Sequence, residues 1–260
     1  MSNYDVIIIG TGVSGLFAAL NLSKDKKVLV ITKTIADESD SFLAQGGICV
    51  QRTDDDYDSF IEDTLKAGHY ENDRNSVAIM VTQSREIIND LLDIGVEFDK
   101  ENAGFSYTKE GAHSKARILH CKDRTGKEIS SKLLEKVRQL KNVEILENTI
   151  LLDILADHNH CYGVVVRDKD NNLRNLYAHF TIFATGGIGG LYEKSTNYPH
   201  LTGDAIAIAL RHNIRLKNIN YIQIHPTALY TEQPGRAFLI SESVRGEGAV
   251  LLDKYGNRFT

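Results

Sequence analysis

A glycine-rich turn between two short apolar segments constrains the fold more than any other feature of the sequence. Residues 6–9, VIII, form a continuous apolar run of the kind found in a strand buried on both faces. The turn GTGVSG follows at residues 10–15, helical apolar spacing covers residues 16–23, and a second apolar run, VLVI, occupies residues 28–31. This order of strand, tight turn, helix and strand predicts a βαβ unit with parallel strands.

The turn has the GxGxxG spacing of dinucleotide-binding proteins. Gly10 permits the tight turn, Gly12 lets the backbone approach a pyrophosphate, and Gly15 lets the helix pack closely on the strand. The free N–H groups and the positive dipole end of the helix favour phosphates. We therefore expect a dinucleotide to bind at Gly10, Thr11, Gly12, Val13, Ser14 and Gly15. The alternative is a glycine turn that has no ligand.

The end of the second strand departs from the usual fingerprint, which has an acidic residue there to bind the ribose hydroxyls. The sequence has Thr32 and Lys33 instead. A threonine cannot grip a ribose in the bidentate manner of a carboxylate, which disfavours a plain NAD enzyme. Lys33 is a candidate for contact with a phosphate or with the adenosine ribose, and the alternative is an exposed lysine at a strand end.

Further glycine turns favour a long cofactor. SFLAQGGI at residues 41–48 follows the second strand, where ligands cross the carboxyl ends of a doubly wound sheet. Its two adjacent glycines would let the backbone lie against a flat ring, although an ordinary turn has the same composition. ATGG at residues 184–187 repeats the change from strand to glycine turn, so a two-part cofactor such as FAD is favoured. Asp204, in TGD at residues 202–204, either caps the next helix or hydrogen-bonds the ribityl chain of a flavin.

The remaining chain alternates helices and strands without a repeat or a linker. We expect helices at residues 59–67, 76–94, 128–139 and 204–212, and strands at residues 143–146, 162–167, 173–178 and 180–184, the last of them buried. DNN at residues 170–172 predicts a hairpin turn. The fold class is therefore α/β: a Rossmann-like, doubly wound parallel sheet with an added antiparallel β-hairpin, followed by the beginning of an α+β capping domain. We place the nucleotide-binding domain at residues 1–218 and the start of the capping domain at residues 219–260.

The composition argues against several classes of function. A net charge of -5 disfavours nucleic acid or an anionic membrane surface as main partner. No apolar run approaches the roughly 20 residues of a membrane span, and the N-terminus lacks the features of a signal peptide. The three cysteines are far apart, so we expect neither disulfides nor a metal site. We expect the protein to be located in the cytoplasm. We interpret the acidic run at residues 54–56 as a solvated loop.

Together these motifs resemble the flavoprotein subunit family of succinate dehydrogenase, fumarate reductase and L-aspartate oxidase. The resemblance rests on the order and spacing of GTGVSG at residues 10–15, AQGG at 44–47, ATGG at 184–187, TGD at 202–204, HPTA at 225–228 and ESVRGEG at 242–248. Each segment alone is unspecific, but the combination covers the whole chain and is highly specific. Thr32 fits as well, because a small hydroxyl residue is common at that position of the family.

The resemblance implies FAD as the cofactor. Membrane-bound members carry a histidine that bonds covalently to the flavin, four residues before the alanine of the AQGG segment. This sequence has Asp40 at that place, so we expect FAD to bind non-covalently. Besides the first glycine turn and Lys33, the implied cofactor residues are Asp40, Ser41, Phe42, Leu43, Ala44, Gln45, Gly46, Gly47, Leu152, Ala184, Thr185, Gly186 and Asp204.

Within the family, residues 108–126 and the segment DSFIEDTLKAG at residues 58–68 are similar to the L-aspartate oxidase pattern. That resemblance implies hydride transfer from L-aspartate to FAD, which forms iminosuccinate, with O₂ (giving H₂O₂) or fumarate as electron acceptor. Glu110 is the candidate that faces the substrate ammonium and favours aspartate over succinate by charge pairing. His113 would line the same side, whereas some of Lys115, Arg117 and His120 would serve packing or solvent contact only.

The other catalytic candidates also come from the resemblance. His225 and Ser241 would bind a substrate carboxylate, although His225 alone is typical of a histidine at a strand end. Glu242 and Arg245 would share a helix face and belong to a proton route, the alternative being a surface ion pair. The family's catalytic arginine would follow Thr260, so we expect an incomplete chain that does not turn over alone.

Three functions stay open. The first is L-aspartate oxidation in de novo NAD (quinolinate) biosynthesis, with quinolinate synthase as the next enzyme and no nucleic acid or membrane as partner. The second is a soluble fumarate reductase or succinate dehydrogenase-type flavoprotein. The third is a non-catalytic FAD-binding fragment.

Overall fold

The chain divides into two units in the computed structural model, which describes residues 3–102, 104–225, 227–241, 244 and 248–258. Unit 1 contains residues 1–43 and 129–239, and unit 2 contains residues 44–128 and 240–260. Unit 1 thus contains the glycine turns at residues 10–15 and 184–187. The functional division into residues 1–218 and 219–260 stays a prediction.

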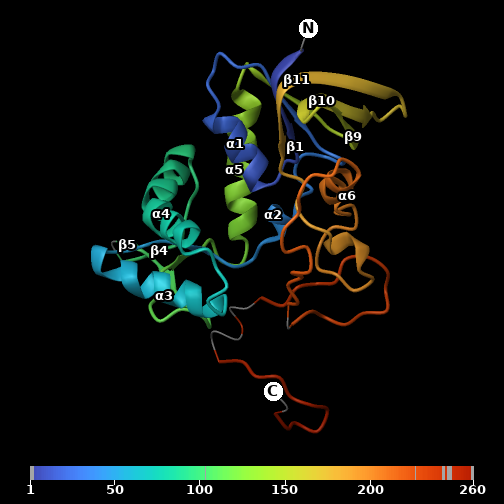
Figure 1. Cartoon of the computed structure of the whole chain (residues 1–260). Helices are drawn as coiled ribbons and strands as arrows, with labels where there is room; N and C mark the ends of the chain where they lie inside the picture. The colour runs from blue at the N-terminus through green and yellow to red at the C-terminus, as the bar shows by residue number, and fades with distance from the viewer. Residues whose placement is uncertain (1–2, 103, 226, 242–243, 245–247, 259–260) are drawn as a thin grey trace. The chain divides into compact units, whose positions relative to one another are not determined.

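Unit 1 is built around a six-stranded sheet in the order β8-β2-β1-β11-β10-β9, part of which is labelled in Figure 1. Its strands are β1 (Tyr4–Ile9), β2 (Val28–Ile31), β8 (Val143–Leu146), β9 (Ile150–Asp157), β10 (His160–Arg167) and β11 (Leu173–Phe183). The strands β8, β2, β1 and β11 run parallel to one another, whereas β11, β10 and β9 form an antiparallel meander. This arrangement confirms the predicted parallel sheet with an antiparallel addition.

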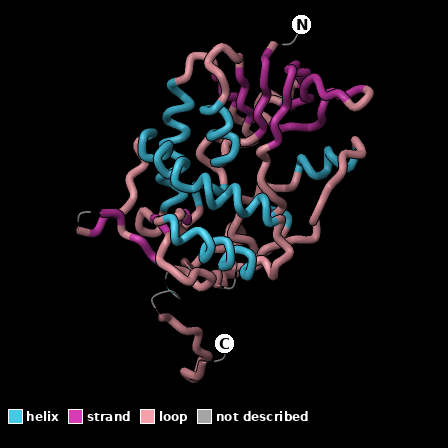
Figure 2. The backbone as a smooth tube through the Cα atoms, turned by 60° about the vertical axis from the view of Figure 1, so that its left-hand side comes forward, coloured by secondary structure: helices cyan, strands magenta, loops and turns pink. Residues whose placement is uncertain are grey.

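The core of unit 1 lies on both faces of β1 and β2. Ile7 and Leu29 belong to a cluster that also includes Ile154 of β9 and Ile208 of helix α6 (Asp204–Arg211). The alternating residues, such as Ile8, are equally buried, and helix α1 (Val13–Asn21) packs against both strands. Each fully buried aliphatic side chain contributes about 1.5–3 kcal/mol, so these short strands are firmly held. Figure 2 shows the strands of this sheet gathered near the N-terminus.

The register of the parallel strands brings three chain segments to one edge of the sheet. Ile9 pairs with Ile31 on one side and with Phe183 on the other. The residues that follow these strand ends, Gly10, Thr32 and Ala184, therefore emerge at the same level. The carboxyl edge of a parallel sheet is where α/β folds bind ligands.

Strand β11 differs from the sequence prediction, which had two strands at residues 173–178 and 180–184. One continuous strand spans both, because its first part pairs with β10 up to Tyr177 and its second part pairs with β1 from Ala178 onward. The prediction that residues 180–184 are buried is wrong: Phe180 is 70% exposed, Phe183 is 37% exposed, and the other three residues are only partly buried. A run of apolar residues does not reveal that one strand serves two partners in succession.

Unit 2 combines helices with short strands. Its helices are α3 (Tyr57–Ala67), α4 (Arg74–Ile94) and the first turn of α5 (Thr125–Gln139), whose remainder belongs to unit 1; its strands are β3 (Ile48–Cys49), β4 (Lys100–Glu101), β5 (Gly104–Phe105), β6 (Tyr107–Thr108) and β7 (Ile118–Leu119). The strands form the sheets β3-β7-β6 and β4-β5. Helices α3 and α4 share an apolar cluster that includes Phe60 and Val81. Helix α4 begins at an N-cap, Asp73, whose carboxylate accepts the N–H of Ser76, and it ends at Gly95 with φ 102°.

The acidic run at residues 54–56 forms a 3₁₀ helix (Asp54–Asp56) and not a loop. The prediction of solvation holds for the exposed Asp54 and Asp55 but is wrong for Asp56. Asp56 is buried, with 1% of its surface exposed, and it pairs with the fully buried Arg117. Buried carboxylates need such partners, and the partner lies 61 residues away in the sequence.

None of the helices in the described ranges is long and apolar enough to cross a membrane.

Candidate functional site

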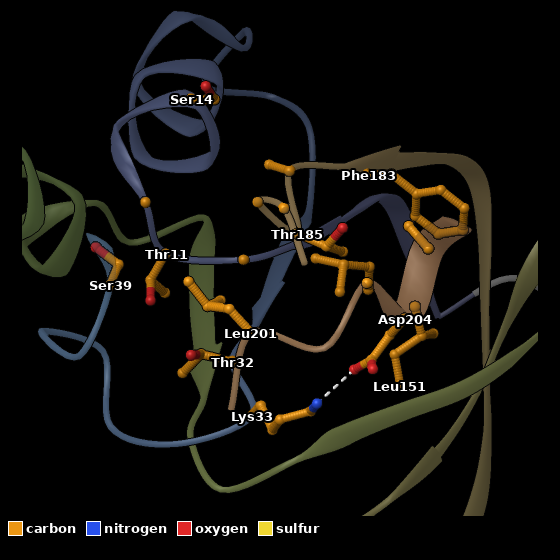
Figure 3. Close-up of a pocket in the computed structure, with 18 of the residues that line it drawn as sticks. Thr11, Ser14, Thr32, Lys33, Ser39, Leu151, Phe183, Thr185, Leu201 and Asp204 are labelled. Atoms are coloured by element: carbon orange, nitrogen blue, oxygen red, sulfur yellow. Dashed lines mark ion pairs between the residues drawn. The ribbon is translucent and has the colours of Figure 1, made fainter. Parts of the chain in front are cut away.

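A cavity of about 650 Å³ opens at the carboxyl edge of β1, β2 and β11, all within unit 1 (Figure 3). That volume lies within the range of small-molecule sites. Twelve of the predicted cofactor residues line it: Gly10, Thr11, Gly12, Val13, Ser14, Lys33, Asp40, Ser41, Ala184, Thr185, Gly186 and Asp204. Residues far apart in the sequence therefore meet where the sheet register brings the strand ends together.

The glycine turn has the geometry that its spacing predicts. Gly10 has φ 115°, and a Cβ there would collide with the carbonyl oxygen of Ala184. A Cβ on Gly15 would collide with the carbonyl oxygen of Gly10, so this glycine lets α1 approach β1 and does not itself line the cavity. Gly12 has φ −68°, and its Cβ would stand only 3.2 Å from the hydroxyl of Ser41. The missing side chain at Gly12 therefore keeps space free beside the cavity.

The N-terminus of α1 is suited to an anion. Gly12 is the N-cap and has no side chain to cap the helix. The hydroxyl of Ser41 accepts the N–H of Val13 at 3.0 Å, and Val13 and Ser14 are exposed where they line the cavity. A helix start of this kind favours a phosphate by its N–H groups and its dipole.

Ser39, a residue that was not predicted from the sequence, independently indicates a ligand. Its side chain lines the cavity (Figure 3), and its hydroxyl is buried without a hydrogen-bond partner among the described residues. An unsatisfied buried hydroxyl costs about 1–3 kcal/mol, which a polar ligand group would recover. With the open glycine turn and the uncapped helix start, these residues fit a dinucleotide such as FAD.

Asp40 starts the short helix α2 (Asp40–Leu43) and lines the cavity. Its carboxylate accepts the N–H of Tyr198 at 3.0 Å and the side-chain amide of Asn197. Burial raises the pKa of Asp40 despite the opposing effect of these hydrogen bonds. Asp40 therefore connects α2 to residues 197–198, whereas Phe42 and Leu43 do not line the cavity.

Leu152, a predicted cofactor residue, does not line the cavity, but its neighbour Leu151 does. Successive side chains of a strand point to opposite faces, so only one of the two can reach the site. Leu151 is 5% exposed, while the carbonyl of Leu152 accepts a hydrogen bond from Arg211. Had β9 been predicted as a strand, the alternation of its side chains would have shown that only one of Leu151 and Leu152 can face the cavity.

The predicted cofactor residues at positions 44–47 belong to unit 2. The carbonyl of Ala44 accepts the N–H of Gly126, and a Cβ on Gly47 would collide with Ile118 and Leu119. The side-chain oxygen of Gln45 is buried without a partner among the described residues. Gly46 lies beside the Glu110 carboxylate, since a Cβ there would be 3.4 Å from Oε1. Gly47 thus lets this segment pack closely, and the side-chain oxygen of Gln45 stays without a partner among the described residues.

Glu110 and His113 come together with Cys49 in unit 2. Burial and the negative charge of Glu110 raise the pKa of Cys49 to about 11, so its side chain stays a thiol. The imidazole of His113 lies between Cys49 Sγ, 3.5 Å from Nε2, and Arg117 Nη1, 3.2 Å from Nδ1. Because a guanidinium can only donate, Nδ1 accepts and the ring hydrogen resides on Nε2. The structure therefore brings the two predicted substrate-side residues together.

Arg117 contacts His113 and is itself held by two aspartates. Its guanidinium is fully buried and pairs with Asp56 at 2.8 Å and with Asp63. Burial alone would raise the pKa of Asp56, but hydrogen bonds from Arg117 and Ser59 outweigh it and lower the pKa to about 2. Of the three residues left open as packing or solvent contacts, Arg117 is thus a packing residue.

The remaining catalytic candidates fall in different units or outside the described residues. His225 belongs to unit 1, where Nδ1 lies 2.9 Å from the carbonyl oxygen of Thr227. Ser241 belongs to unit 2, and its carbonyl accepts the N–H of Val244. Glu242 and Arg245 lie outside the described residues. The proposed carboxylate site and proton route therefore stay predictions.

Comparisons with known proteins agree with this site. The family described as FAD binding domain matches residues 5–260. The chain is 49% identical to an L-aspartate oxidase of Clostridium perfringens and 47% identical to that of Clostridium acetobutylicum; each alignment covers 98% of this chain, but only 58% and 59% of the relative. A solved E. coli quinol fumarate reductase FrdA superimposes with a TM-score of 0.89 at 28% identity, over 98% of this chain and 44% of that one. The chain spans less than two thirds of these relatives, and it belongs to the family of FAD binding domains.

Proposed function

We propose that the protein is an L-aspartate oxidase, which oxidises L-aspartate to iminosuccinate. The observation that carries the proposal is the 49% identity to a relative of that name over 98% of this chain, against 28% for the fumarate reductase structure. When bound, FAD accepts the hydride from the substrate carbon, and O₂, with formation of H₂O₂, or fumarate takes up the electrons.

Glu110 is proposed to recognise the substrate ammonium. Its carboxylate lies beside Gly46, in the segment that the family resemblance assigns to the cofactor. A negative charge there attracts the ammonium of aspartate and has no partner on succinate, so it discriminates between the two dicarboxylates. His113 follows in the same turn, and its backbone N–H donates to the carbonyl of Glu110 at 3.0 Å.

His225 and Ser241 are proposed to bind a substrate carboxylate, and Glu242 and Arg245 to carry the proton away. The family resemblance supports these four roles. We further propose that quinolinate synthase uses the product. The proposed location of this protein is the cytoplasm.

A second candidate is a fumarate reductase or succinate dehydrogenase-type flavoprotein, which the TM-score of 0.89 to FrdA favours. A third is a domain that binds FAD without catalysis. Peroxide formation separates the three: the FAD-loaded full-length protein should release H₂O₂ with L-aspartate and not with succinate. Reduction of fumarate by an artificial donor without any aspartate oxidation would support the second candidate, and retained FAD that neither substrate reduces would support the third.

A further inference from the structure

Lys33 stands at the end of β2, where a cofactor phosphate or ribose was expected to meet it. Its ammonium group instead makes three contacts inside the protein: Asp204 Oδ2 at 2.7 Å, the carbonyl oxygen of His200 at 2.9 Å and Thr202 Oγ1 at 3.0 Å. An ammonium has three N–H donors and no acceptor. All three donors of Lys33 are therefore used by residues 200–204.

Asp204 is in the opposite situation. Its Oδ1 accepts the hydroxyl of Thr202 at 2.7 Å, and its Oδ2 accepts from Lys33. Each carboxylate oxygen can accept two hydrogen bonds, so each keeps one acceptor position. The side chain is 28% exposed, lines the cavity, and faces Lys33 along its lower edge in Figure 3. Asp204 can still receive a ligand hydroxyl, whereas Lys33 has no donor left to give.

Lys33 helps to hold the turn that carries Asp204, alongside the bond from the Gly190 N–H to the carbonyl of Leu201 and the contact of His200 Nε2 with the carbonyl of Glu38. Gly203, the N-cap of α6, has φ 72° and provides no side-chain cap, so the helix start does not fix the turn by itself. Lys33 bonds to His200 and Thr202 on the same turn and thereby holds it against the end of β2. The positive charge of Lys33 also offsets the negative charge of Asp204. Without Lys33, the Asp204 carboxylate would repel a phosphate in the same cavity.

We propose that Lys33 is a positioning residue and not a phosphate ligand: it holds Asp204 and the 200–204 turn so that the remaining acceptor positions of Asp204 bind a hydroxyl of FAD. The proposal rests on the binding of FAD in this cavity. The hydroxyl contact of Asp204 and the phosphate contact of the N-terminus of α1 are those expected from the sequence, and the proposal adds the role of Lys33.

A double-mutant cycle on FAD affinity tests the proposal. The dissociation constant of FAD is measured by flavin fluorescence for the wild-type apoprotein, Lys33→Met, Asp204→Ala and the double variant. We expect each single variant to weaken FAD roughly tenfold, and Lys33→Met to have less than about a twofold effect once Asp204 is absent. Lys24→Met, at an exposed lysine, is the matched control and should leave the affinity unchanged.

An equal loss from Lys33→Met in both backgrounds would overturn the proposal, because a direct phosphate contact does not depend on Asp204. Should a variant fail to fold by circular dichroism, the crystal structure of the wild-type FAD complex decides instead. There we expect Lys33 Nζ to stay on Asp204 and Thr202, and a phosphate oxygen within hydrogen-bond distance of Nζ would refute the role. A wild-type protein that binds no FAD would contradict the cofactor assignment and this proposal with it.

Discussion

Arg117 is a buried cation whose value to the fold comes from two aspartates. Its guanidinium is 0% exposed and pairs with Asp56 and Asp63. Replacement by alanine leaves two carboxylates without their partner, so we expect Arg117→Ala to lower the free energy of unfolding by about 3–5 kcal/mol. Lys115 also faces Asp56, at 3.7 Å, but is half exposed, and Lys115→Ala should cost at most about 1 kcal/mol. Urea unfolding of both variants checks this, and equal losses would contradict it.

The same pair makes the stability depend on acid. The pKa of Asp56 is about 2 in the folded protein, below its ordinary 3.8, so the folded state favours the ionised form. The stabilisation is therefore complete above the unfolded pKa and is lost as the pH falls toward about 2. We expect the difference in unfolding free energy between wild type and Asp56→Asn to stay constant above about pH 5 and to shrink below it. A difference that grows on acidification would refute the assignment.

Glu110 tests the proposed specificity at the level of one charge. We expect Glu110→Gln to raise the KM for L-aspartate roughly tenfold or more, since a charged hydrogen bond contributes about 1.5–3 kcal/mol. Fumarate carries no ammonium, so its use as acceptor should change little. Glu101→Gln removes the same charge from an exposed strand residue and serves as the control. Equal losses with aspartate and fumarate would count against the proposed role.

At the scale of elements, the first glycine turn separates packing from ligand space. Gly15→Ala places a Cβ against the carbonyl of Gly10, so we expect it to destabilise the fold by about 1–3 kcal/mol. Gly12→Ala has an ordinary φ of −68°, so it should keep the stability within about 1 kcal/mol but weaken FAD binding. Gly104→Ala, with open space around its Cβ, controls for the substitution itself. Thermal unfolding and FAD titration should separate the variants, and a loss of stability in Gly12→Ala as large as in Gly15→Ala would contradict this.

The elements that sequence analysis predicted are those with strong local signals. Strands β1 and β2 contain continuous apolar runs, and β8 is a short segment rich in aliphatic residues. The structure confirms all three, as it does helices α3, α4 and α5 near their expected bounds. Strand β9 and helix α2 were missed. Helix α2 is only four residues long. Strand β9 has the apolar sequence ILLDILAD, but a short apolar run does not by itself distinguish a strand from a helix, and its pairing with β10 decides the outcome.

The site was predictable where it follows strand ends and was missed where it depends on distant contacts. The glycine turns at residues 10–15 and 184–187 carry their own spacing, and both line the cavity. The unpaired hydroxyl of Ser39 and the partners of Arg117 have no signal in the nearby sequence, because burial and pairing arise only when segments far apart meet. Lys33 was correctly placed at the cavity, but its engagement with residues 200–204 could not be read from a lysine after a strand.

At the scale of the whole molecule, the chain has two units with distinct tasks in the proposal. Unit 1 contains the cavity that fits a dinucleotide, and unit 2 contains the Glu110 and His113 group that would meet the substrate. The chain spans 58% of the length of the Clostridium perfringens relative. Substrate selection by the proposed enzyme should be measured on the FAD-loaded protein.

The most direct test of the central claim is anaerobic reduction of the bound flavin, followed by its visible absorbance. Without O₂ the assay reports hydride transfer alone, independently of the acceptor that the protein prefers. We expect L-aspartate to bleach the oxidised flavin and an equal concentration of succinate to leave it oxidised. Bleaching by succinate without bleaching by L-aspartate would contradict the assignment as an L-aspartate oxidase.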